Sequence, residues 1–128
     1  MILEDPIVYV VDDDPSLRGA IYSLLRSAGW RVQTFASAGD FLDANPSARP
    51  ACLVLDVRLP GVSGLDLQNE LIKKHVEVPV IFLTGYADIP MSVRAMKAGA
   101  IEFLTKPFDD QELLGAIRKA FEKDHASR

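Results

Sequence analysis

Five short apolar runs recur along the chain at regular intervals, and they are the strongest signal for its fold. They occupy residues 7–11, 30–35, 51–55, 78–83 and 100–104. Val and Ile are prominent in several of them, and three are apolar nearly throughout instead of alternating with polar residues. Continuous apolar runs of this length are typical of strands whose two sheet faces are both covered. We therefore expect five buried strands.

Helix-like segments separate these runs. They cover residues 15–28, a short stretch capped by Ser37, and residues 64–74, 90–98 and 109–123. In the first segment, Leu17, Ile21 and Leu24 share one face, which predicts an amphipathic helix. Strand–helix alternation repeated five times predicts a parallel sheet with helices on both faces. The element count fits a flavodoxin-like, doubly wound (βα)5 fold of the α/β class, with strand order 2-1-3-4-5.

Length and charge narrow the possible partners. The 128 residues fit one domain. The net charge of −4 makes nucleic acid and anionic membranes poor partners for this domain. No apolar run approaches the ~18 residues that a membrane helix needs, and the N-terminus lacks the features of a signal peptide. The single cysteine, Cys52, cannot form an internal disulfide, so we expect a cytoplasmic protein.

Polar residues follow four of the predicted strands. Asp12 and Asp13 follow the first strand, Asp56 the third, Thr84 the fourth and Lys106 the fifth. Ligands of doubly wound sheets bind beyond the carboxyl ends of the strands where the winding reverses, here between the first and third strands. Three carboxylates crowded there repel one another unless one is protonated or a cation lies among them. Oxygen ligands in small number favour Mg²⁺, which keeps several waters and accepts phosphate oxygens.

Lys106 and Thr84 extend this prediction from a cation to a phosphoryl group, because they add a positive charge and a hydroxyl donor. A carboxylate after a strand is more often a turn residue or a helix cap, and we assign that role to Asp14, before Pro15. Aspartates at two adjacent strand ends, with Thr84 and Lys106 at the next two, make coincidence a weaker explanation. We also expect a cis Lys106–Pro107 bond that directs Lys106 over the pocket.

The motifs around these residues resemble the receiver domains of two-component response regulators. They are residues 10–14 (VVDDD), 54–64 (VLDVRLPGVSG), 84–88 (TGYAD) and 96–108 (MKAGAIEFLTKPF). The resemblance covers nearly the whole chain, so residues 1–128 are expected to form one receiver domain. Residues 88–93 (DIPMSV) are most similar to the FixJ subgroup of the FixJ/NarL class. That class commonly carries a C-terminal helix-turn-helix domain, which this chain lacks. A natural single-domain regulator and a shortened chain are both consistent with these residues.

The resemblance implies a phosphoacceptor that assists its own phosphotransfer and dephosphorylation, not an enzyme acting on a separate substrate. Asp56 would take a phosphoryl group from the phosphohistidine of a sensor histidine kinase. Asp13, Asp56 and the backbone carbonyl of Arg58 would bind Mg²⁺ directly, while Asp12 would act mainly through water. The subgroup makes control of transcription the expected output.

The resemblance also implies how the phosphoryl group is sensed. Thr84 and Lys106 would contact the phosphoryl oxygens, and Phe103 would be an aromatic switch that turns inward when Thr84 moves. Position and size suggest a further property apart from the resemblance. Arg58 and Tyr86 lie two residues after Asp56 and Thr84, and both are bulky enough to flank the path of a hydrolytic water, so we expect slow loss of the phosphoryl group.

The predicted helix at 90–98 is apolar around most of its circumference. Its apolar members are Met91, Val93, Ala95, Met96 and Ala98. A single buried face needs fewer apolar positions, so we expect a second face that joins a partner. By analogy, the partner would be a second copy of the chain, in a phosphorylation-dependent homodimer through residues 91–98 and the fifth strand. A small-residue helix lying flat on the sheet is an equal alternative.

Two other functions compete with the receiver interpretation. Residues 12–16 (DDDPS) superficially fit the start of haloacid-dehalogenase-like phosphatases, whose nucleophile is the first aspartate. That family gives Asp56 no role and commonly has a longer chain with a cap. The other alternative is a receiver-like module used only for docking. The intact acidic set, together with Thr84 and Lys106, argues against it.

Overall fold

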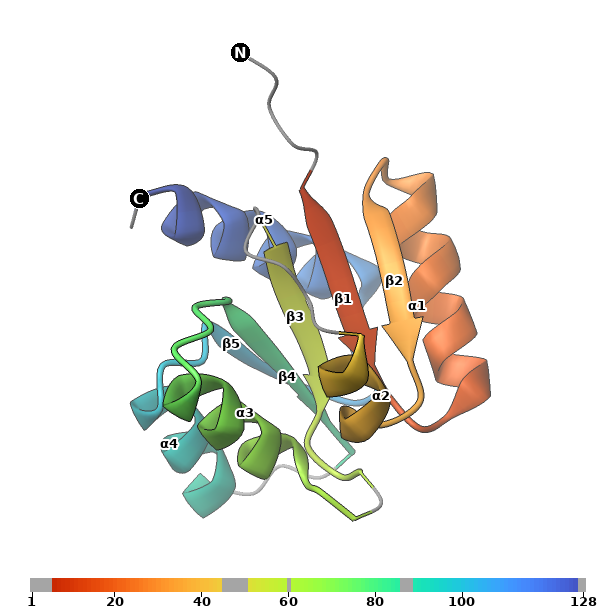
Figure 1. Cartoon of the computed structure of the whole chain (residues 1–128). Coiled ribbons are helices and arrows are strands. Elements are labelled where there is room, and N and C mark those ends of the chain that lie inside the picture. Colours follow the sequence, from red (N-terminus) through yellow and green to blue (C-terminus); the bar gives the residue numbers. More distant parts are fainter. Residues whose placement is uncertain (1–5, 45–50, 60, 86–88, 127–128) are drawn as a thin grey trace.

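A five-stranded parallel sheet forms the centre of the molecule (Figure 1). The computed structural model describes residues 6–44, 51–59, 61–85 and 89–126. The strands are β1 (Ile7–Val11), β2 (Arg31–Phe35), β3 (Ala51–Asp56), β4 (Val80–Thr84) and β5 (Glu102–Thr105). They pair in the order β2-β1-β3-β4-β5, and every pair is parallel. The predicted fold class and strand order are therefore confirmed.

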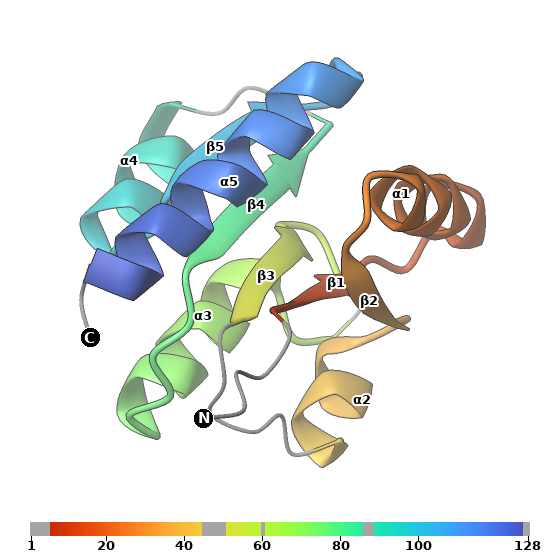
Figure 2. The same ribbon diagram turned by 90° about the horizontal axis from the view of Figure 1, so that it is seen from above.

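Helices cover both faces of the sheet, as Figure 2 shows. They are α1 (Pro15–Ser27), α2 (Ala38–Asp43), α3 (Gly64–Lys73), α4 (Ile89–Lys97) and α5 (Asp110–Ala126). Buried side chains of α1 and α5 pack on one face of the sheet, and those of α2, α3 and α4 pack on the other. Among the described helices, none combines the length and apolar character that crossing a membrane requires.

The first strand has the predicted bounds, whereas several other elements begin or end one to three residues away from them. The fourth and fifth strands each begin two residues later than predicted, at Val80 and Glu102. Trp30 lies just outside β2 instead of beginning it. Its ring stacks on Phe121 of α5 with centroids 4.9 Å apart, so it packs against that helix and not within the sheet. Element ends are the least determined part of such patterns, because capping and packing decide them.

Local capping explains where several helices begin. Asp14 is the N-cap of α1, and its carboxylate accepts hydrogen bonds from the backbone N–H groups of Ser16 and Leu17. This confirms the structural role predicted for Asp14. Ser37 caps α2 as predicted, and Ser63 forms a capping box at the start of α3. Each cap satisfies backbone donors that a helix leaves unpaired in its first turn.

Candidate phosphoacceptor and metal site

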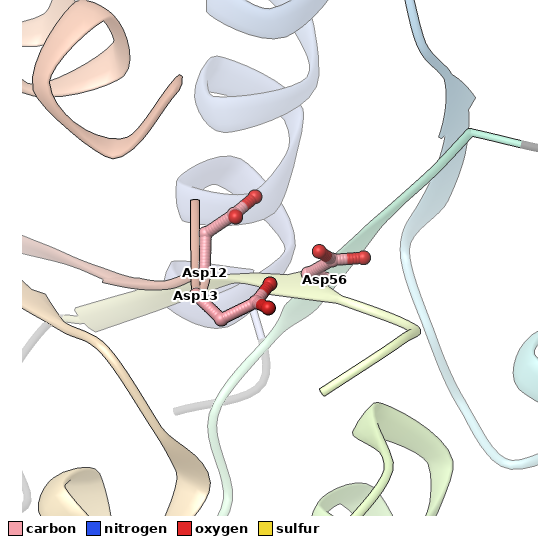
Figure 3. Close-up of side chains that lie close together, drawn as sticks. All are labelled: Asp12, Asp13 and Asp56. Atoms are coloured by element: carbon pink, nitrogen blue, oxygen red, sulfur yellow. The ribbon is translucent and has the colours of Figure 1, made fainter. Parts of the chain in front are cut away.

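Three aspartates meet at the carboxyl ends of β1 and β3, where the winding of the sheet reverses (Figure 3). One carboxylate oxygen from each of Asp12, Asp13 and Asp56 lies within 4.8 Å of the others. Asp12 is fully buried and Asp56 is 5% exposed, whereas Asp13 is exposed. The two strands are direct neighbours in the sheet, so their ends deliver these side chains to one place. The structure thus brings together the three carboxylates that were predicted to converge.

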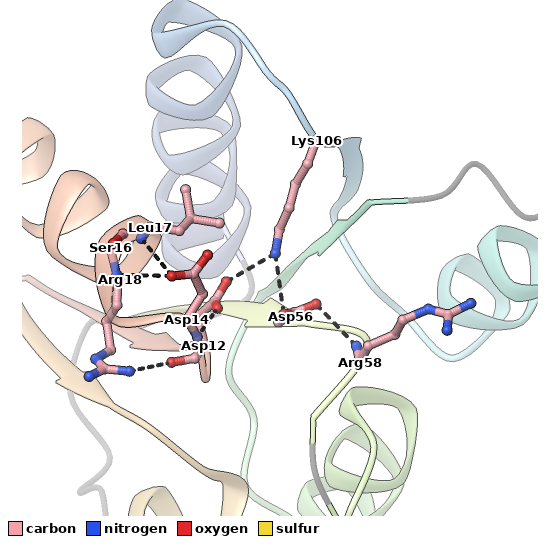
Figure 4. A network of polar contacts seen from close by, with 8 residues as sticks. All are labelled: Asp12, Asp14, Ser16, Leu17, Arg18, Asp56, Arg58 and Lys106. Atoms are coloured by element: carbon pink, nitrogen blue, oxygen red, sulfur yellow. Dashed lines mark hydrogen bonds and ion pairs between the residues drawn. The ribbon is translucent and has the colours of Figure 1, made fainter.

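Lys106 extends from the loop after β5 toward two of these carboxylates, those of Asp12 and Asp56 (Figure 4). Its Nζ lies 3.2 Å from an oxygen of Asp12 and 3.2 Å from an oxygen of Asp56. The peptide bond between Lys106 and Pro107 is cis, as predicted. The backbone N–H of Lys106 also donates to the carbonyl of Thr84, which joins this loop to the end of β4.

Burial and neighbouring charge shape the ionisation of this site. Burial raises the pKa of Asp56, and the charge of Asp12 raises it further, against the opposing effects of the Arg58 N–H and Lys106. Burial alone would lower the pKa of Lys106, but Asp12 and Asp56 outweigh it, so the pKa of Lys106 is raised. Lys106 therefore stays protonated at neutral pH and faces the carboxylates as a cation.

The phosphoacceptor candidate is held at both carboxylate oxygens. The backbone N–H of Arg58 donates to Oδ1 of Asp56 at 3.1 Å, and Lys106 binds Oδ2. The start of α3 lies directly against this segment, because a Cβ at Gly64 would collide with the backbone carbonyl of Asp56. Only glycine lets α3 approach so closely.

A divalent cation suits this set of donors. Three carboxylates face one ammonium group, so the ionised cluster carries excess negative charge in a partly buried place. All the side-chain donors are oxygens, which match a hard cation such as Mg²⁺ better than a soft metal. The residues present therefore fit the predicted ion. The Arg58 carbonyl as a further ligand stays a prediction.

The structure also locates the residues expected to sense a phosphoryl group. Thr84 is fully buried at the end of β4. Phe103 is half-buried on β5, and its ring lies 6.3 Å from that of Phe82 between centroids. Their roles as switch residues stay predictions. Tyr86 lies outside the described residues.

One residue near the site was missed by sequence reasoning. Arg18 of α1 donates from Nη1 to the backbone carbonyl of Asp12 at 2.8 Å. In the sequence, Arg18 occupies a polar position of an amphipathic helix, which gives no sign of a contact with the strand end. The only available signal was its distance of one helical turn from the expected N-cap.

Unlike this polar site, the surface of α4 exposes apolar side chains. Val93 and Met96 are 44% and 45% exposed, whereas Ala95 is buried against the sheet. The side chain of Met91 is not among those that the structure describes. Among the side chains of α4 that the structure describes, Ala95 faces the core while Val93 and Met96 face outward, which is compatible with the predicted second face.

Known proteins with similar sequences include response regulators and transcriptional regulatory proteins. Residues 8–118 match the family model described as response regulator receiver domain. Nodulation protein W of Bradyrhizobium diazoefficiens is 53% identical over 122 residues, which are 95% of this chain and 54% of that protein. The transcriptional regulatory protein FixJ of Azorhizobium caulinodans is 46% identical over 111 residues, 87% of this chain and 53% of that protein. The chain thus spans about half the length of these relatives.

Solved structures give the same result. The response regulator StyR has a TM-score of 0.91 at 50% identity, covering 98% of this chain and 63% of that one. A structure titled FixJ-N has a TM-score of 0.86 at 39% identity and covers 94% of this chain and 96% of that one. The phosphatase alternative finds no support among these comparisons.

Proposed function

Because this chain belongs to the response regulator receiver domains, we propose that it is the phosphorylation switch of a two-component system and that Asp56 accepts the phosphoryl group. A sensor histidine kinase would be the donor. The observation that carries the proposal is the joint position of three carboxylates and Lys106 at the ends of neighbouring strands.

Exposure favours Asp56 over Asp12 as the nucleophile. Each of these two carboxylates accepts the backbone N–H of the residue two positions further on and lies 3.2 Å from Nζ of Lys106. Asp12 is fully buried, whereas Asp56 keeps a small exposed fraction that a phosphodonor could reach. In the transfer, a carboxylate oxygen of Asp56 forms a bond to phosphorus while the phosphorus–nitrogen bond of the phosphohistidine breaks. An ionised carboxylate needs no general base for this step.

The charged residues around Asp56 prepare the site for a phosphoryl group. Lys106 is protonated and near enough to neutralise oxygen charge that develops during transfer. Asp12, Asp13, Asp56 and the backbone carbonyl of Arg58 would hold Mg²⁺. When bound, Mg²⁺ supplies positive charge that stabilises the phosphoryl oxygens during transfer. Thr84, at the end of the adjacent strand, would donate a hydrogen bond from its hydroxyl to the phosphoryl group on Asp56.

The output of the switch would follow from the response of Thr84 and Lys106. A phosphoryl group adds charge near −2 and three strong acceptors, so it favours a state in which both residues move toward it. Both residues lie at the ends of β4 and β5, beside α4. We expect Phe103 to turn inward with Thr84 and the face formed by α4 and β5 to change, which would control dimerisation and then transcription.

The dimer has its own test. The outward-facing Val93 and Met96 offer apolar surface that a second copy could cover. Sedimentation of Asp56-phosphorylated protein should show dimers, and a Met96→Glu variant should stay monomeric while labelling normally. A phosphorylated wild type that stays monomeric at high concentration would reject the dimer and favour the helix that lies flat on the sheet.

Labelling with a phosphorylated kinase or with acetyl phosphate tests the function itself. With Mg²⁺ present, the wild type should incorporate phosphate and Asp56→Asn should incorporate none. Asp43→Asn is the matched control, since it makes the same change at an exposed position on α2. Phosphate-ester turnover that survives Asp56→Asn would instead support a phosphatase.

A further inference from the structure

The backbone between β1 and α1 has an anchor that comes from the helix. Arg18 is half-buried in α1, and its Nη1 donates to the carbonyl oxygen of Asp12 at 2.8 Å (Figure 4). That carbonyl belongs to the peptide group that joins Asp12 to Asp13. Its orientation therefore influences where the exposed Asp13 side chain is directed.

The neighbouring backbone groups are already fixed on both sides of this peptide. The N–H of Asp12 donates to the carbonyl of Phe35 at 3.1 Å. On the other side, the N–H of Asp14 donates to Oδ1 of Asp12 at 2.9 Å, and the Asp14 side chain caps α1. A rotation of the Asp12–Asp13 peptide would have to break the bond from Arg18.

We propose that Arg18 is a positioning residue for the metal site: it fixes the Asp12–Asp13 peptide so that the Asp13 carboxylate faces Asp56. This inference rests on the proposed function of the acidic site. In this role Arg18 would act through the backbone carbonyl of Asp12 and not as a ligand of the ion or the phosphoryl group. A hydrogen bond from a charged donor is stronger than a neutral one, which suits it to hold a peptide beside three mutually repelling carboxylates.

Electrostatics alone predicts the opposite effect of this residue. A cationic guanidinium near the carboxylates repels a second cation, so its removal should tighten Mg²⁺ binding by charge alone. Positioning predicts weaker Mg²⁺ binding after the same removal, because Asp13 would no longer be held toward Asp56. The sign of the change in Mg²⁺ affinity therefore separates the two effects.

The experiment is a calorimetric Mg²⁺ titration of the full chain without any phosphodonor. Arg18→Met keeps most of the length of the side chain and loses the donor, and we expect the Mg²⁺ Kd to rise about 10-fold. The Kd of Arg18→Lys should lie between those of the wild type and Arg18→Met, because a single ammonium on a shorter side chain replaces the branched guanidinium. Arg26→Met is the control: it removes the same charge from an exposed position in the last turn of α1.

A second readout separates positioning from general damage to the fold. In labelling with acetyl phosphate, the half-saturating Mg²⁺ concentration of Arg18→Met should rise in parallel with the Kd. Its rate at saturating Mg²⁺ should stay within about 2-fold of wild type, since the ion restores the arrangement once bound. A fall in the saturated rate with no change in Kd would overturn the proposal.

The outcomes distinguish this inference from the proposed function. An unchanged or lower Kd for Arg18→Met, in a protein that still labels on Asp56, overturns the role of Arg18 alone. A wild type that binds no Mg²⁺ overturns both proposals. A Kd about 10-fold higher in Arg18→Met, a smaller rise in Arg18→Lys and an unchanged Kd in Arg26→Met would support the positioning role.

Discussion

Two regions of the molecule are built on the same sheet but are stabilised by different contacts. One is the acidic end of β1 and β3, and the other is the face formed by α4 and β5. At the acidic end, backbone bonds, a helix cap and two ion pairs fix Asp12 and Asp56 in buried positions. On the α4–β5 face, Val93 and Met96 are exposed, and an ion pair between Lys119 and Glu102 lies at the surface with 3.8 Å between charged atoms.

This difference assigns different tasks to the two regions. A site for phosphoryl transfer needs groups that are already in place, because positioning and electrostatics supply most of the catalysis. A surface that reports the reaction needs two states of similar free energy, and such regions have few buried contacts. One described link joins α4 to its neighbour α3: the buried Gln68 donates to the carbonyl of Ala95 at 3.3 Å.

The largest effect on stability is expected at the acidic end of β1 and β3. Gly64→Ala would press a methyl group against the backbone of Asp56, and we expect it to lower the free energy of unfolding by about 2 kcal/mol. It should also slow phosphate labelling, because Asp56 must shift. Denaturant unfolding and labelling rates check both effects.

Gly19→Ala is the matched control for this change. Gly19 lies in α1 with no atom near the position of an added Cβ, so alanine there should stabilise the protein by up to about 1 kcal/mol. Equal effects of the two substitutions would contradict the claim that the end of β3 is held more tightly than its surroundings.

A smaller effect is expected where the α4 helix is attached. Gln68→Leu removes the donor to Ala95, whose carbonyl still accepts the N–H of Ala100, so the loss in stability should be about 1 kcal/mol. Hydrogen exchange should speed up in α4 and stay unchanged in β1 and β3. Accelerated exchange throughout the sheet would show that the two regions are not separate.

The smallest expected effect concerns ionisation of the acidic end of β1 and β3 without metal. The pKa of Asp56 is raised in the folded protein, so the fold binds the proton more tightly than the unfolded chain does. Stability is therefore lost as pH rises from the ordinary value of 3.8 through the folded pKa, and the loss persists at neutral pH. Asp56→Asn should raise stability at pH 7 by less than Gln68→Leu lowers it, and this gain should shrink in acid.

Thermal unfolding in a chelator across pH 3 to 8 measures this gain, with Asp43→Asn as the exposed control. A destabilised Asp56→Asn at pH 7 would mean that the ion pair with Lys106 contributes more than burial costs.

The fold and most of the site could be predicted because they depend on topology. Parallel strands present their carboxyl ends at one edge, so residues that follow adjacent strands must meet there. For that reason Asp12, Asp13, Asp56 and Lys106 could be assigned to one place from their sequence positions alone.

Contacts that helix residues make with other elements and loops could not be predicted in the same way. Arg18 reaches Asp12 only because α1 begins where Asp14 caps it, and Gln68 reaches Ala95 only because α3 and α4 cover the same face. Trp30, in the loop before β2, stacks on Phe121 of α5, which is distant in sequence. Such contacts depend on side-chain rotamers and helix packing, which periodicity does not specify.

Mapping the position of the phosphoryl group tests the central claim most directly. The wild type would be treated with acetyl phosphate and Mg²⁺, the acyl phosphate reduced with borohydride, and the peptides examined by mass spectrometry. Modification confined to Asp56 is the predicted result. Modification at Asp12 or Asp13, with Asp56 unchanged, would contradict the account.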